Sequence, residues 1–428
     1  GKFNQTVLDE VKEIIELPDR ASKYKCDPAT VKLDPAVISE LREYVTAISQ
    51  MYRHNSFHCF EHASHVVQSV TKLLSRVVTP DKRIDRVNSG KDNATSNNGE
   101  SEEWTYQQQD MNKGNNRNSG RTKQLHEYTY GITSDPLTQF ACAFSALIHD
   151  VDHCGVPNTV LVKEGVGIAI HYKNKSVAEQ NSVDLAWELL GHDNFANLRR
   201  CICATQSELE RFRQLVVNSV MATDIADKDL GALRKARWER AFAEQDDGES
   251  DCNRPKSLAD SSDGVSISDA AHSSGPNAKQ QCSKHERRLS RLMAQNRKAT
   301  IVIEHLIQAS DVSHCMQHFD IYMKWNYRLF QEMSRAYELD RSNTEPSLGW
   351  FKSEIWFFDN YVIPLARKLD ECGVFGAHSQ EYLNYALQNR KRFALTGKKA
   401  IEDYKTRYQE EKKMKNKKMS AKPSFDEL

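Results

Sequence analysis

Histidine and carboxylate residues gather in two short segments of this chain. His149 and Asp150 stand side by side at the end of a long apolar stretch, and His153 follows. A second group lies upstream and contains His54, His58, His62 and His65. Imidazole and carboxylate are ligands that zinc and harder divalent metals share. The two segments therefore predict one buried metal centre built from several helices.

The element that must position His149 and Asp150 is a helix with a clear start signal. Asp135 can cap a helix that begins at Pro136, because Pro is well suited to the first helical position. Apolar residues then recur at helical spacing and predict a buried face: Leu137, Phe140, Ala141, Phe144, Leu147 and Ile148. That face ends at His149-Asp150, so we expect these side chains at the inner end of a core helix.

Helical periodicity dominates the remainder of the chain. Apolar residues repeat every three to four positions in residues 6–78, and the segments 208–243, 300–340 and 350–370 also read as helical. No run alternates convincingly with the two-residue period of a strand. The sequence predicts an all-α fold, in the form of a compact multi-helix domain around a binuclear metal site.

Two polar stretches interrupt this pattern. Residues 84–126 and 246–284 are rich in Ser, Asn, Asp, Gly and charge, and they contain few aliphatic side chains. Such segments bury too little apolar surface to offset their ordering entropy, so we predict two disordered insertions. We expect a catalytic domain over residues 1–400 and a charged tail over residues 401–428.

Composition narrows the kinds of partner. Lys and Arg number 59 and balance 59 Asp and Glu, so we expect no nucleic-acid partner. No run approaches the roughly 20 apolar residues of a membrane span, and we expect no membrane segment in this chain. The ten cysteines are scattered, and no signal peptide is visible. We therefore expect a cytoplasmic protein, or the cytosolic part of a larger one. The chain begins with Gly1, as a fragment would, which leaves room for missing upstream domains.

The order of the motifs carries a family resemblance. The segment from His149 to Asn158 reads His-Asp-x-x-His-x-Gly-x-x-Asn, and it follows a His58-x-x-x-His62 pair. Together they resemble the class I 3′,5′-cyclic nucleotide phosphodiesterase catalytic domain, within the His-Asp metal phosphohydrolases. The resemblance spans roughly residues 5–395, less the two insertions. Further matching segments are Tyr172 to Glu179, Met221 to Asp224, Ser310 to Ser313 and Phe357 to Leu365.

The resemblance implies a set of metal ligands: His62, His149, Asp150 and Asp311. Two imidazoles and two carboxylates suit Zn²⁺. The second oxygen of Asp150 can bridge to a harder ion, Mg²⁺ or Mn²⁺, about 3.5–4 Å away. Asp311 lies at the core edge of a helical stretch, where an unpaired carboxylate would be costly, and this favours a metal there.

The resemblance also assigns residues around the metals. His153, Glu179 and Thr223 match positions that order water around the second ion. His58 matches the general acid that protonates the leaving oxygen, and it lies one helical turn from His62. Glu179 has an equally weighted alternative, because Ser176-x-x-Glu179 is the pattern of a helix capping box. Thr223 could be a plain helix polar group.

The predicted nucleotide pocket departs from the family pattern. Phe357 matches the aromatic residue that stacks on the purine, but Glu354 stands at the position of the usual Gln and His314 at that of an Asn. An ionised Glu354 only accepts hydrogen bonds, which favours guanine with its two adjacent donors. We hypothesise a preference for cGMP. The alternative is that Glu354 faces solvent or pairs with Lys352.

These residues predict a metal-dependent hydrolase that cleaves the 3′-phosphoester bond of cAMP or cGMP and releases the nucleoside 5′-monophosphate, ending a cyclic nucleotide signal. A broader His-Asp phosphohydrolase with another nucleotide or phosphoester substrate is a second reading, which Glu354 leaves open. A non-catalytic cyclic-nucleotide binder is a third, although no implied metal ligand is missing.

Overall fold

The computed structural model describes residues 5–19, 31–76, 126–242, 276–375 and 379–420. Across these residues the regular elements are all helices, so the prediction of an all-α fold is confirmed. In this described part, no helix is both long and apolar enough to cross a membrane.

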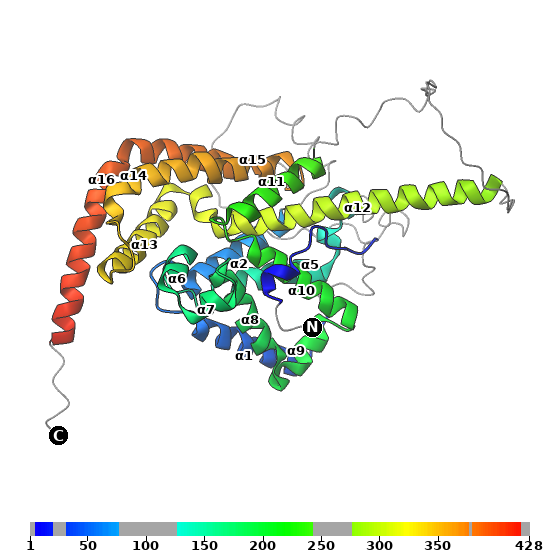
Figure 1. The fold of residues 1–428 in the computed structure, drawn as a ribbon, viewed down its shortest axis with the longest axis horizontal. Coiled ribbons are helices and arrows are strands. Elements are labelled where there is room, and N and C mark those ends of the chain that lie inside the picture. Colours follow the sequence, from blue (N-terminus) through cyan, green and yellow to red (C-terminus); the bar gives the residue numbers. More distant parts are fainter. Residues whose placement is uncertain (1–4, 20–30, 77–125, 243–275, 376–378, 421–428) are drawn as a thin grey trace, which may run out of the picture.

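In Figure 1, α1, α2 and α5 to α10 gather below α12, whereas α11 lies along α12. Asp135 caps α5 by accepting from the Thr138 backbone N–H, as the sequence predicts. The elements are η1 (Val7–Glu10), α1 (Pro35–Met51), α2 (Phe60–Ser75), η3 (Ile132–Ser134), α5 (Pro136–Ile148), α6 (Asn158–Glu164), α7 (Gly167–His171), α8 (Val177–Gly191), η4 (Asp193–Phe195), α9 (Ala196–Ile202), α10 (Gln206–Met221) and α11 (Lys228–Phe242).

The second half supplies the long helices. Figure 1 shows α12 running through the molecule and extending beyond it, and α16 lying over α14 and α15 before it turns down past α13. A π-helical turn, η7, joins α14 to α15. The elements are α12 (Pro276–Asp311), η6 (Ser313–Met316), α13 (Phe319–Glu338), α14 (Pro346–Phe357), η7 (Phe358–Val362), α15 (Ile363–Glu371) and α16 (Ser379–Ser420).

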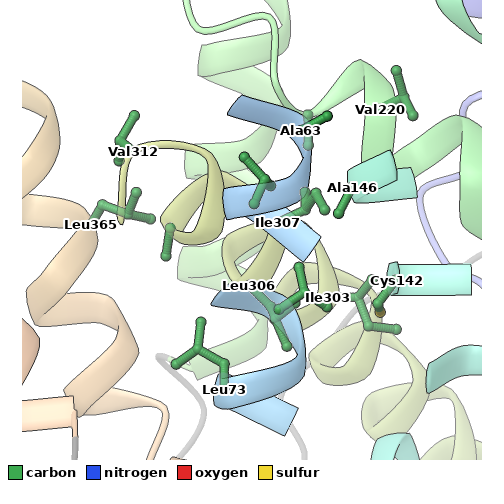
Figure 2. Close-up of a cluster of buried hydrophobic side chains, with 14 of the residues drawn as sticks. Ala63, Leu73, Cys142, Ala146, Val220, Ile303, Leu306, Ile307, Val312 and Leu365 are labelled. Carbon is green, nitrogen blue, oxygen red and sulfur yellow. The ribbon is translucent and has the colours of Figure 1, made fainter. Parts of the chain in front are cut away.

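The core that positions the site lies where α2, α5, α10 and α12 meet. Figure 2 shows Ile303 and Ile307 of α12 among apolar side chains of α2 and α5. Ala63 and Ala146 are fully buried there, and their small size lets α2 and α5 approach α12. His62 adjoins Ala63, and His149 lies just beyond α5, so this packing brings both histidines to one place.

The structure changes three predicted boundaries. Helix α12 already begins at Pro276, so residues 276–284 of the second predicted insertion are helical. His126, the last residue of the first predicted insertion, is buried and its Nδ1 lies 2.5 Å from the Ser134 hydroxyl. Ile401 and Tyr404 are buried, so the first turns of the predicted tail belong to the folded domain. Polar composition hides these boundaries, because a helix propagates cheaply once its core turns are packed. Residues 84–125 and 246–275 lie outside the described residues.

Candidate metal centre and substrate cavity

Four side chains from three helices meet at the predicted metal centre. His62 projects from α2, His149 and Asp150 follow α5, and Asp311 ends α12. The His62 Nε2 atom lies 2.9 Å from Asp311 Oδ1, and His149 Nε2 lies 3.1 Å from Asp150 Oδ2 and 3.4 Å from Asp311 Oδ1. Both histidines are buried. We call these four residues the metal floor.

The orientation of His149 tests whether the metal floor suits a cation. Its Nδ1 lies 3.0 Å from the Ala146 carbonyl, which it can meet only as an N–H donor. In the neutral ring, Nε2 then carries a lone pair aimed at two carboxylates. The arrangement is stable only with a positive charge at that point. The donors therefore fit a divalent metal ion.

The pKa values of the metal-floor residues also indicate that a positive charge is favoured between the carboxylates. Burial lowers the pKa of His149, but Asp150 and Asp311 outweigh burial and raise that pKa well above its usual value. Burial acts in the opposite direction on Asp150, where the nearby positive charges of His149 and His58 hold the carboxyl pKa well below its usual value. The site thus favours two anionic carboxylates around a cation.

A second cluster lies beside the metal floor and contains His58, His153 and Glu332. Glu332 Oε1 lies 2.5 Å from His58 Nδ1, while its Oε2 accepts from the backbone N–H groups of Phe57 and His58. The ring centroids of His58 and His153 lie 3.8 Å apart. Burial opposes ionisation of His58, but Glu332 and Asp150 raise its pKa to about 9.

Glu332 is a functional candidate that sequence reasoning missed. It falls seven residues after Trp325 on the buried face of α13, where an acidic residue stands among aromatic ones. Despite burial, His58 and the backbone N–H groups lower the pKa of Glu332 to about 2, so the carboxylate is anionic. A buried acid on an apolar helix face was the available signal, because such a group needs a partner.

The predicted water-ordering residues also gather near the metal floor. His153, Glu179 and Thr223 all line the same cavity as Asp150. Asn158 donates to Glu179 Oε2 at 2.8 Å and to Asp224 Oδ2 at 3.3 Å, a linking role that the sequence did not reveal. Burial and the neighbouring Asp224 raise the pKa of Glu179 to about 8.

The capping-box alternative for Glu179 is wrong. Ser176 has a left-handed φ of +39° and makes no side-chain cap hydrogen bond. The Ala178 N–H is instead satisfied by Asn158 Oδ1 at 2.9 Å. The Thr223 hydroxyl donates to the Val220 carbonyl at 2.7 Å, as a helix-end threonine often does, while the residue still faces the cavity.

The cavity above the metal floor has a volume of about 820 Å³. This size is within the range of small-molecule sites. Nine of the eleven predicted site residues line it, and His62 and His149 lie behind its wall: the lining set is His58, Asp150, His153, Glu179, Thr223, Asp311, His314, Glu354 and Phe357.

The lining of the same cavity also contains Glu354, Phe357 and Tyr322, and we call this group the Glu354 end. Glu354 Oε2 accepts from the Tyr322 hydroxyl at 2.9 Å, and Glu354 is only 8% exposed. The alternative of a solvent-facing or Lys352-paired Glu354 is therefore wrong. Phe357 ends α14 directly before the π-helical turn and stacks on Tyr361, with ring centroids 5.3 Å apart.

The protonation state of Glu354 differs from the expectation that this side chain is fully ionised. Burial raises its pKa to about 7, against the opposing hydrogen bond from Tyr322. Near neutral pH both forms are therefore populated, and the protonated form offers a donor as well as an acceptor. His314 is also buried, and burial followed by nearby His62 lowers its pKa to about 3, so it is a neutral ring.

Comparison with known proteins identifies the family. The 3′5′-cyclic nucleotide phosphodiesterase family matches residues 122–379, which is more than half of the chain. The chain belongs to this family, and the expectation of a class I catalytic domain is confirmed.

Individual relatives match over shorter stretches. A probable 3′,5′-cyclic-AMP phosphodiesterase pde-4 of Caenorhabditis elegans is 26% identical over 191 residues, which is 44% of this chain and 20% of that protein. A human dual specificity calcium/calmodulin-dependent 3′,5′-cyclic nucleotide phosphodiesterase 1C is 37% identical over 87 residues, or 20% of this chain and 12% of that protein. The chain thus spans a fifth or less of the length of these relatives.

A solved structure supports the fold over most of the chain. The phosphodiesterase domain of the RhoPDE fusion protein from the choanoflagellate Salpingoeca rosetta aligns with a TM-score of 0.51 and covers 86% of each chain. Sequence identity is 17%, so this similarity concerns the fold alone.

Proposed function

We propose that this chain hydrolyses the 3′-phosphoester bond of 3′,5′-cyclic nucleotides and releases nucleoside 5′-monophosphates. The observation that carries the proposal is the meeting of His62, His149, Asp150 and Asp311 beside a cavity of about 820 Å³, which Asp150 and Asp311 line. Family membership supports the reaction class.

The proposed cofactors are two divalent ions, a Zn²⁺ held by His62, His149, Asp150 and Asp311 and a Mg²⁺ or Mn²⁺ that shares Asp150. When bound, the ions supply positive charge that activates water and offsets the charge of the phosphate. His153, Glu179 and Thr223 are the proposed ligands of ordered water around the second ion. Their common position on the cavity wall supports this role.

His58 is the proposed general acid. Its Nδ1 donates to the anionic Glu332, so the proton on Nε2 is the one available to the leaving O3′ oxygen. Glu332 holds the ring and stabilises the imidazolium, because its negative charge raises the pKa of His58 to about 9. The acid is thus charged at neutral pH before the reaction begins.

The Glu354 end is the proposed purine site. Phe357 supplies an aromatic face for stacking, and Glu354 meets the base edge while Tyr322 fixes its other oxygen. His314, a neutral buried ring on the same wall, completes the polar lining. An ionised Glu354 suits the N1–H and N2–H₂ donors of guanine, so we propose a preference for cGMP where Glu354 is ionised.

We also propose a cytoplasmic location, or the cytosolic part of a larger protein. Support comes from the described cysteines Cys59, Cys142, Cys154, Cys201, Cys203, Cys315 and Cys372, which are free thiols.

The test is product analysis with the purified chain, loaded in turn with Zn²⁺, Mg²⁺ and Mn²⁺. Incubation with cAMP and cGMP should yield the 5′-monophosphates, identified by chromatography against the 3′-monophosphates. A chain that binds metal but releases 3′-monophosphates, or hydrolyses only unrelated phosphoesters, would contradict the proposal.

A further inference from the structure

Two loops carry the histidines on either side of the reaction site. The first, residues 52–59 between α1 and α2, carries His58, and the second, residues 149–155 after α5, carries His153. We call them the His58 loop and the His153 loop. The relative position of the two loops matters because the ring centroids of His58 and His153 lie only 3.8 Å apart.

The His153 loop is bonded by Met51, the last residue of α1, and by Arg53 and Asn55 of the His58 loop. The Met51 carbonyl accepts from the Asp152 N–H at 3.1 Å. Arg53 donates to both oxygens of Asp152 at 2.6 and 3.0 Å. Asn55 Nδ2 donates to the His153 carbonyl at 2.7 Å. These contacts follow one another along both chains, so they form a continuous seam between the loops.

Asn55 makes the link closest to the chemistry. Its Nδ2 also donates to the His58 carbonyl at 3.1 Å, so one amide group joins the backbones of both histidines. A side-chain NH₂ has two donors, and both are used here.

Gly155 of the His153 loop also packs closely against Asn55. A Cβ atom added to Gly155 would lie 3.0 Å from Asn55 Oδ1, and Gly155 has a left-handed φ of +70°. Asp152, which Arg53 holds, has a φ of +61° that is uncommon outside glycine. The His153 loop is thus folded tightly against Asn55.

We propose that Asn55 is a positioning residue that sets the distance between His58 and His153. This rests on the proposed function, in which His58 donates a proton and His153 orders water. Glu332 holds the His58 loop from α13, and Asn55 holds it from the other side. The Arg53–Asp152 pair is a weaker outer link, because its side chains are 50% and 32% exposed.

The test variant is Asn55→Asp, which keeps the shape of the side chain but turns both donors into an acceptor facing two carbonyl oxygens. A displacement of about 1 Å can cost about 10²-fold in rate, so we expect kcat for a cyclic nucleotide to fall about 10- to 100-fold. KM should stay within about threefold, because the Glu354 end is untouched. Bis(p-nitrophenyl) phosphate, whose leaving group needs no proton, should lose much less rate.

Asn218→Ala is the matched control. Its buried amide also donates to two oxygens, those of the Lys12 carbonyl and of Glu304, but on the N-terminal side of the core. We expect it to lower Tm while preserving kcat per folded molecule. If Asn55→Asp behaves like this control, or loses rate equally on both substrates, Asn55 is merely structural and the proposal is overturned.

A crystal structure of Asn55→Asp separates this proposal from the proposed function. The His58–His153 ring spacing should depart from 3.8 Å in the variant, and an unchanged spacing would overturn the positioning role. Failure of the wild-type chain to hydrolyse either cyclic nucleotide would instead contradict the proposed function, whatever the spacing.

Discussion

The metal floor and the Glu354 end border one cavity, and they stabilise buried carboxylates in opposite ways. At the metal floor, Asp150 is surrounded by imidazoles, and its pKa lies well below the usual value. At the Glu354 end, Glu354 has a tyrosine hydroxyl for a partner, and burial raises its pKa to about 7. A buried acid is thus fixed as an anion only where positive charge surrounds it.

The metal floor should therefore respond to mutation with the largest effects. His149→Ala and Asp150→Ala should each abolish turnover and lower bound metal, because loss of a ligand leaves an uncompensated site. Elemental analysis and the phosphate-release rate check this. His54→Ala, on an exposed histidine outside the cluster, is the control. Full activity in either ligand variant would contradict the proposal that the metal floor binds the catalytic metal ions.

Mutation of His58 tests whether this residue acts as a proton donor or as part of the metal floor. His58→Ala should lower kcat for a cyclic nucleotide by about 10²-fold or more while metal content stays near that of the wild type. A nitrophenyl phosphodiester should be affected much less. Equal losses on the two substrates, or a loss of metal, would mean that His58 belongs to the metal floor.

Glu332 should control the pH dependence of activity through His58. A general acid must be protonated, so activity should fall as pH rises through the pKa of His58, which is about 9. Glu332→Gln removes the negative charge that raises this pKa, so the alkaline limb of the kcat profile should move to lower pH, with about a tenfold loss of rate above neutrality. Glu164→Gln, which breaks only a half-buried surface pair with Arg341, should leave the profile in place. An unmoved alkaline limb in Glu332→Gln would contradict the role of Glu332.

Glu354 should give the smallest effect, a change of preference. The ionised form predominates above pH 7 and favours guanine, whereas the protonated form below pH 7 resembles a Gln amide. The ratio of kcat/KM for cGMP to that for cAMP should rise several-fold between pH 6 and 8. Groups facing Glu354, namely Tyr322, Cys315 and Tyr404, have pKa values raised above this window and do not titrate within it.

Glu354→Gln provides the control for that experiment. The variant should lose the pH dependence of the ratio and improve cAMP turnover relative to cGMP. A ratio that is flat with pH in the wild type and unchanged in the variant would mean that Phe357 binds either purine by stacking alone.

Sequence patterns predicted the α5 frame well, because its signals are local. Asp135, Pro136 and the apolar face of α5 lead directly to His149. The expectation that His58 lies one helical turn from His62 is wrong, because α2 begins at Phe60 and His58 lies in the loop before it. The partners of these residues were harder to predict. Glu332 lies 274 residues from His58 in the chain, and Tyr322 carries no motif that announces a contact with Glu354. Packing of α13 against the site creates these pairs, and the sequence of α13 signals a buried acid without showing which residue it contacts.

Tyr404 of α16 is buried against α13, and this contact affects the order in which the protein can fold during synthesis. Its hydroxyl donates to the Met323 carbonyl at 3.1 Å, and its ring lies 5.0 Å from that of Tyr327. Chains emerge from the ribosome N-terminus first. Helices α2 and α5 are thus synthesised long before the residues that brace α13. During synthesis, the histidines of the metal floor are available well before the Glu354 end can acquire its final shape.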